Sequence, residues 1–246
     1  MRGAAASRAP GAPERIDQAI TRDILRGTYR PGIRLPTLRE LAVKFGVNPA
    51  TVQRALARLE VKGLVTARQG SGLLVNDPYA VGDVSLLADW LAVSLDEPAQ
   101  AAAILEDILE ARRVLATRLI VRHRARILTA IDELMADRQR FAEAAAYDLP
   151  RLDLEVARTL VRATGNTVVL AMINSVARAI EELPILADAM YAEPERNLSS
   201  IARVLAALHA GGSDLGAEVE RVFAEVDAQT VTRFRALLEQ RRANDR

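Results

Sequence analysis

The apolar positions of residues 13–61 recur with the three- and four-residue spacing of amphipathic helices, in three separate runs. The runs consist of Ile16, Ala19, Ile20, Ile24 and Leu25; of Leu38, Leu41, Ala42 and Phe45; and of Val52, Ala55, Leu56 and Leu59. Residues 64–68 and 73–75 follow with the composition of strands, and the glycine-containing residues 69–72 between them predict a hairpin with a four-residue loop. Three short helices and a hairpin predict a winged helix-turn-helix at residues 13–77.

Capping signals fix the starts of the second and third of these helices. Thr37 and Glu40 have the spacing of a capping box, in which the hydroxyl caps a backbone N–H and the glutamate reaches back. Gly46 ends that helix. Asn48 followed by Pro49 starts the next one, because Asn is a good N-cap and the N–H that proline lacks has no partner there anyway.

Beyond residue 77 the pattern is helical almost throughout. One apolar stripe begins at Leu105, Ile108 and Leu109, and another runs through Leu152 and Val156. Breaks fall at residues 163–166, 184, 194 and 211–212, where glycine, asparagine or proline interrupts the pattern. We expect a mainly α protein, with an all-α domain of six or seven helices at residues 78–240. A disordered tail at residues 1–12 and a C-terminal tail at 241–246 complete the predicted organisation.

The net charge of +1 conceals a division between the two predicted domains. Residues 1–75 carry 11 Arg and 2 Lys against 5 acidic residues, a net charge of +8, so the rest of the chain has −7. A basic segment indicates a polyanionic partner such as nucleic acid. The alternative is a helical module that docks a protein, with its charges solvated.

The predicted third helix supplies the candidate DNA contacts, because the second helix of a helix-turn-helix pair enters the major groove. Glutamine pairs with adenine edges, and arginine with guanine or phosphate. Residues of the preceding helix and of the hairpin tip face the backbone or the minor groove. The candidate set is Arg34, Thr37, Arg39, Asn48, Ala50, Thr51, Gln53, Arg54, Arg68, Gln69, Gly70 and Ser71.

Residues 27–42, 45–56, 63–65 and 68–72 resemble the GntR family of bacterial transcription regulators. The resemblance implies an operator-binding domain. Many members read a guanine with an Arg directly after the residue that caps the recognition helix, whereas this chain has Pro49 there. The sequence of residues 48–52 is more similar to the YtrA branch. The operator sequence of this chain therefore cannot be inferred from those of better-known branches.

The later residues resemble the FadR-like branch of the same family, through segments that include residues 85–87, 95–97, 164–166 and 191–195. The aminotransferase-like branch is excluded, since its cofactor needs a lysine and the only lysines are Lys44 and Lys62. The HutC-like branch is α/β, and strand alternation is missing after residue 77.

The FadR-like resemblance implies a pocket for a long-chain acyl-CoA or fatty acid. The effector-binding candidates are Arg112, Asp153, Asn166, Asn174 and Asp227. Where the branch has Gly, Ser and Trp on its last helix, this chain has Ala224, Asp227 and Val231, and a carboxylate there would repel the phosphates of CoA. Two alternatives remain. The effector is a different small carboxylate metabolite, or the chain is a dimeric DNA-binding protein without an effector.

We expect no metal, no cofactor and no enzymatic activity. Related helical domains bind a metal with one Asp and three His, whereas this chain has only His123 and His209 and no cysteine. Neither a nucleophile–base pair nor a phosphate-binding loop is recognisable. The longest uncharged stretch, residues 163–177, is shorter than the roughly 18 residues of a membrane span. The first residues contain no apolar h-region, so we expect no signal peptide. The sequence thus predicts a cytoplasmic, homodimeric regulator that binds palindromic double-stranded DNA and a small-molecule effector.

Overall fold

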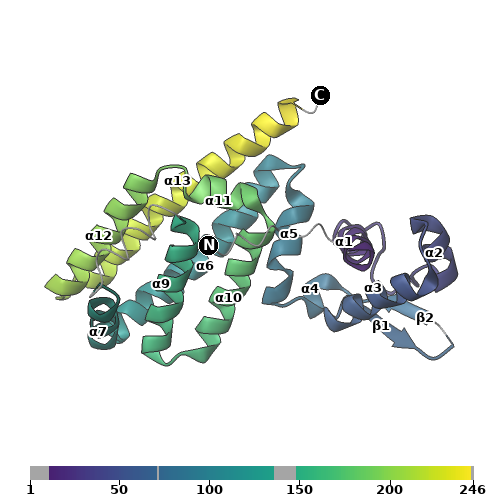
Figure 1. The fold of residues 1–246 in the computed structure, drawn as a ribbon, viewed down its shortest axis with the longest axis horizontal. Coiled ribbons are helices and arrows are strands. Elements are labelled where there is room, and N and C mark those ends of the chain that lie inside the picture. Colours follow the sequence, from purple (N-terminus) through teal and green to yellow (C-terminus); the bar gives the residue numbers. More distant parts are fainter. Residues whose placement is uncertain (1–10, 71, 136–147, 245–246) are drawn as a thin grey trace, which may run out of the picture. The chain divides into compact units, whose positions relative to one another are not determined.

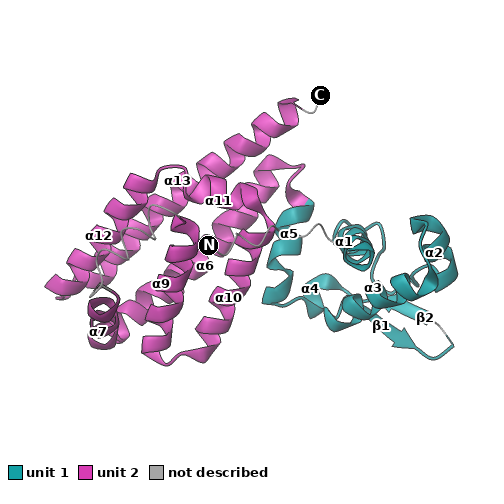
Figure 2. Cartoon of the chain, in the orientation of Figure 1, with its two compact units in different colours: residues 1–93 teal, residues 94–246 magenta. Residues whose placement is uncertain are grey.

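The computed structural model describes residues 11–70, 72–135 and 148–244, which divide into two compact units at residues 93 and 94 (Figure 2). Residues 1–10, most of the predicted N-terminal tail, lie outside the described part. The elements of the first unit are α1 (Ala12–Leu25), α2 (Leu38–Phe45), α3 (Pro49–Val61), β1 (Val65–Arg68), β2 (Gly72–Val75), α4 (Pro78–Val81), the 3-10 helix η1 (Val84–Leu86) and α5 (Leu87–Ser94), which ends at the boundary (Figure 1). The second unit contains α6 (Pro98–Arg122), α7 (Arg124–Met135), α9 (Leu149–Thr164), α10 (Thr167–Glu182), α11 (Pro184–Met190), α12 (Pro194–Ala210) and α13 (Leu215–Asn244).

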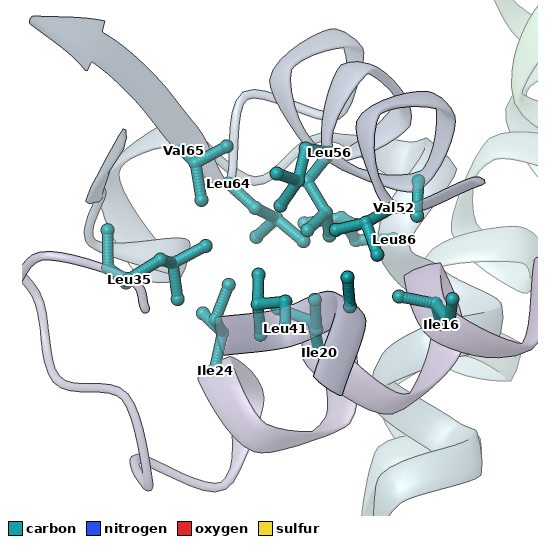
Figure 3. Close-up of a cluster of buried hydrophobic side chains, with 14 residues drawn as sticks. Ile16, Ile20, Ile24, Leu35, Leu41, Val52, Leu56, Leu64, Val65 and Leu86 are labelled. Carbon is teal, nitrogen blue, oxygen red and sulfur yellow. The ribbon is translucent and has the colours of Figure 1, made fainter. Parts of the chain in front are cut away.

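One core joins the helices of the first unit to its hairpin. Ile20, Leu41 and Val52, from the three predicted apolar faces, are completely buried and belong to one cluster (Figure 3). Val65 and Val75 from the hairpin strands belong to the same cluster, as does Leu64 directly before β1. The predicted winged helix-turn-helix is therefore confirmed.

The wing is a hairpin with an added flank. Arg68 pairs with Gly72, so the connecting loop is residues 69–71, one residue shorter than predicted. The segment before α2 lies along β2, where Leu35 N–H donates to the Leu73 carbonyl at 2.9 Å and Gly32 N–H to the Val75 carbonyl at 2.8 Å. This pairing holds the stretch that carries Arg34 against the wing.

The first unit continues past residue 77, where the sequence predicts the end of the DNA-binding domain. Leu86 is completely buried in the same core as the three helices. The Arg26 side chain donates to the Val93 carbonyl at 3.0 Å, and Lys62 contacts Asp89 at 3.1 Å. The segment 78–93 packs here because its apolar residues cover this core, a contact that helical periodicity alone does not reveal.

The second unit is helical, and its described residues form seven helices, as predicted. The most extensive helix contact joins α6 to α13 (Figure 1). The predicted breaks coincide with helix ends: Gly165 has a left-handed conformation directly after α9, and Pro184 and Pro194 start α11 and α12. The last helix continues to Asn244, into the predicted C-terminal tail, with two arginines in its last turn that complement the helix dipole.

Within the described residues, no helix is long and apolar enough to cross a membrane.

Candidate nucleic-acid interface

The capping box predicted at the start of α2 is present. The backbone N–H of Thr37 donates to Glu40 Oε2 at 2.7 Å, and the N–H of Glu40 donates to the Thr37 hydroxyl at 3.3 Å. The Thr37 hydroxyl in turn donates to Glu40 Oε2 at 2.8 Å. The two hydrogen bonds that the carboxylate accepts from Thr37, chiefly the one from the backbone N–H, lower the pKa of Glu40. Gly46 ends α2 in a left-handed conformation. Thr37 thereby fixes the start of α2, and the predicted DNA contact by its side chain stays a prediction.

Asn48 and Thr51 together form the start of α3. Asn48 Oδ1 accepts the N–H of Thr51 at 2.8 Å and the Thr51 hydroxyl at 3.0 Å. The Thr51 residue is only 6% exposed. The structure thus differs from the expectation that Thr51 faces a base edge, because its side chain is directed into the cap and the core.

The remaining candidates of α3 lie on its open side. Ala50, Gln53 and Arg54 are exposed, whereas Val52 and Ala55 of the same helix are completely buried. The amphipathic spacing therefore leaves one polar face at the N-terminal half of α3. This face has the side chains that major-groove recognition requires.

The arginines of the unit fall into two groups. Arg34, Arg39, Arg54 and Arg68 are exposed, and no ion-pair partner reaches their guanidinium groups from the part of the chain that the structure describes. Arg58, one turn after Arg54, contacts Glu14 at 2.8 Å instead. The acidic residues of α1 thus neutralise the side of α3 that packs on them and leave the side with Arg54 positive.

The wing carries the rest of the predicted contacts. Arg68, Gln69 and Gly70 are exposed, and Ser71 lies outside the described residues. Gly70 and Gly72 both have a positive φ, a backbone conformation that residues with a Cβ rarely adopt. A Cβ built on Gly72 would lie 3.7 Å from the Arg34 side chain, so Arg34 runs alongside the wing.

The second unit brings together two of the predicted effector residues. Arg112 Nη2, on α6, lies 2.5 Å from Asp227 Oδ1 on α13, and its guanidinium lies 5.7 Å from the centre of the Phe223 ring. Asp227 is buried, and burial raises the pKa of its carboxyl while Arg112 and Arg113 oppose that rise. The carboxylate predicted to repel an anion is therefore neutralised by arginine.

The other effector candidates have separate partners. Asp153 accepts a hydrogen bond from the Tyr191 hydroxyl at 2.7 Å. Burial, and then the Asp153 charge, raise the pKa of Tyr191, which stays a neutral donor, and Arg112 is close enough to oppose this shift. Asn166 caps α10 through the N–H of Val169, and the exposed Asn174 accepts from Arg158. The structure thus pairs Asp153 with Tyr191 and engages both asparagines in local roles.

Sequence reasoning missed Arg113, Tyr191 and Phe223. Tyr191 lies in one of the segments that resemble the FadR-like branch, which was the available signal. No comparable signal marked Arg113 or Phe223, since each becomes part of the cluster only through the contact between α6 and α13. Among the described residues, no group of three or more His, Cys, Asp or Glu side chains is placed to hold a metal ion.

Comparison with known proteins finds a family match within the first unit. Residues 13–75 match the family described as bacterial regulatory proteins, gntR family, which comprises regulators and not enzymes. The Uxu operon regulator of Haemophilus influenzae is 37% identical over 114 residues, 41% of this chain and 43% of that protein. An HTH-type transcriptional regulator of Mycobacterium tuberculosis is 46% identical over 65 residues, 26% of this chain and 27% of that protein.

The histidine utilization repressor of Klebsiella aerogenes is 40% identical over 65 residues, 26% of this chain and 27% of that protein. The chain thus spans less than half the length of each of these relatives. The solved structure of Lar, described as controlling the expression of the Listeria monocytogenes agr system, is similar over 91% of this chain and 98% of its own, with 18% identity and a TM-score of 0.49.

Proposed function

We propose that this chain, which carries a GntR-family helix-turn-helix domain at residues 13–75 and a helical domain after it, is a transcriptional regulator that binds a palindromic operator as a homodimer. The proposal is carried by four exposed arginines that have no ion-pair partner among the described residues. They are Arg34 beside the wing, Arg39 on α2, Arg54 on α3 and Arg68 on the wing. Two symmetric half-sites follow from the two-fold symmetry of a homodimer.

The roles of these residues follow from their positions. α3 enters the major groove, where Gln53 pairs with an adenine edge and Arg54 with guanine or phosphate. Arg39 and the wing residues contact phosphates, which positions the protein on the duplex without reading its sequence. Pro49 has no side-chain donor, so base recognition rests on the residues that follow it.

The test compares two arginines of α3 that lie one turn apart. An operator is first obtained by selection from random DNA, and its affinity is then measured by fluorescence anisotropy at several salt concentrations. Arg54→Ala is expected to cost about 1–3 kcal/mol per half-site and to reduce the salt dependence. The control Arg58→Ala removes an equal charge that already pairs with Glu14, and should leave the affinity nearly unchanged. Equal losses in both variants would contradict this orientation of α3.

We further propose that an anionic small molecule bound in the helical domain modulates operator affinity. Arg112 supports this, because its side chain is 31% exposed beside Phe223 and only one of its N–H groups has a partner in the described part of the chain. The FadR-like resemblance makes a long-chain acyl-CoA or a fatty acid the first choice. Histidine and other small carboxylates serve as comparison ligands, since one relative is named for histidine utilization.

The ligand test measures thermal stability and operator affinity with acyl-CoAs and fatty acids of increasing chain length. Each buried methylene contributes about 0.8 kcal/mol, so the affinity should rise with length until the site is full. Arg112→Ala should weaken binding of every chain length. A response to small carboxylates alone would favour another metabolite, and no response to any ligand would favour a DNA-binding protein without an effector.

A further inference from the structure

The carboxylate of the buried Asp227 forms ion pairs with two arginines, one at each oxygen. Its Oδ1 lies 2.5 Å from Arg112 Nη2 and its Oδ2 lies 2.9 Å from Arg113 Nη1, while the residue itself is 4% exposed. Both arginines belong to α6 and Asp227 to α13, so this one carboxylate connects the two helices that make the most extensive contact of the unit.

The two arginines are not equivalent. Arg113 is the less exposed of the two, and it also holds Glu220 at 2.9 Å, so two carboxylates fix its position. Arg112 has Asp227 as its one carboxylate partner among the described residues, keeps unused N–H donors, and is the more exposed guanidinium. If the contact between Arg112 and Asp227 is broken, the negative charge of Asp227 is therefore still compensated by Arg113.

We propose that Asp227 is an internal counter-ion, which an anionic ligand displaces from Arg112 when it binds. This rests on the proposed effector site at Arg112 and adds how that site is controlled. The incoming group is a carboxylate or a phosphate, because a planar guanidinium binds both through two parallel N–H donors. Asp227 lowers the affinity of the resting protein for that anion, so a weak or uncharged ligand does not trigger the exchange.

The exchange changes the contact between α6 and α13. In the resting state Asp227 holds both Arg112 and Arg113, and with ligand bound it holds Arg113 alone. A ligand alters an equilibrium only by preferring one of two arrangements, and the loss of this contact on binding is such a preference. α6 begins at Pro98, a few residues after the first unit ends, so the contact that the ligand changes belongs to the helix that follows the first unit in the chain.

The experiment measures ligand affinity by isothermal titration calorimetry on the full chain. The proteins are wild type, Asp227→Asn, the control Glu220→Gln and Arg112→Met, each titrated with dodecanoate and with dodecanoyl-CoA. Hydrogen bonds to charged groups contribute about 1.5–3 kcal/mol, so release of Arg112 in D227N should tighten binding about tenfold or more. E220Q should bind like wild type, because Glu220 contacts Arg113 and not Arg112, and R112M should lose binding. The two ligands distinguish a free carboxylate from the phosphates of CoA as the anion.

The variant D227N should fold, since burial disfavours the charged form of this carboxyl and asparagine has nearly the same shape. Asp227→Ser is the second variant, and circular dichroism confirms the fold of each. If wild type binds the ligand as tightly as folded D227N or D227S, or more tightly, the counter-ion role is overturned and the effector site is left intact. Absence of binding in all of these proteins would overturn the effector site and the counter-ion role together.

Discussion

At the residue scale, the Thr37–Glu40 capping box makes the start of α2 sensitive to acid. The folded-state pKa of Glu40 lies below its ordinary value of 4.5, because Thr37 donates to the carboxylate. A lowered folded pKa means that the stabilisation is present above the unfolded pKa and is lost as pH falls through the folded value. Glu40→Gln should therefore melt below wild type at neutral pH, and the difference should shrink in acid.

This prediction is checked by thermal unfolding between about pH 3 and pH 7. The difference between wild type and variant isolates Glu40 from other titrating groups, including the buried Asp17. A difference that stays constant across this range would contradict the contribution of the Glu40 charge.

At the element scale, Lys62 joins three helices at the C-terminal end of α3. Its Nζ lies 3.2 Å from Asp17 Oδ2 of α1 and 3.1 Å from Asp89 Oδ2 of α5. The Asp17 side chain is 5% exposed, and burial raises the pKa of its carboxyl while Lys62 opposes this. Loss of Lys62 leaves a buried carboxylate poorly compensated, so Lys62→Met should cost on the order of 2–3 kcal/mol of unfolding free energy.

The measurement is urea unfolding followed by the fluorescence of Trp90, the single tryptophan of the chain, which packs against the core of the first unit. The control Arg58→Met removes a half-exposed cation whose nitrogen lies 3.7 Å from Asp17, and should cost less than about 1 kcal/mol. Equal costs for the two variants would mean that Lys62 has no special part in holding α5.

At the scale of the whole molecule, the first compact unit ends at residue 93 and not with the hairpin, and we expect its stability to depend on residues 78–93. Leu86 is completely buried in this core and Trp90 packs against it, so a fragment that stops at residue 77 lacks apolar cover for its core. Removal of one buried leucine side chain typically costs about 2–5 kcal/mol. A fragment of residues 11–93 should therefore melt cooperatively and at a higher temperature than residues 11–77, as measured by calorimetry. Equal melting temperatures would assign residues 78–93 to the helical domain.

The sequence by itself determined the winged helix-turn-helix and its caps. Signals such as Thr37 with Glu40, Asn48 with Pro49, and the apolar spacing of α3 act within one or two helical turns, so they are readable without tertiary contacts. The helical character of the second unit and its breaks at Gly165, Pro184 and Pro194 follow from equally local rules.

Only the tertiary structure decided how charges and side chains pair across the chain. Asp227 lies 115 residues after Arg112, and no local pattern indicates that α6 and α13 bring the two together. Thr51 appeared polar and available in the sequence, yet packing buries it, and the segment 78–93 joins the first unit because its apolar residues cover the open core there. Local propensities determine elements, whereas burial and electrostatic pairing depend on which elements pack together, and this is fixed only when the chain folds.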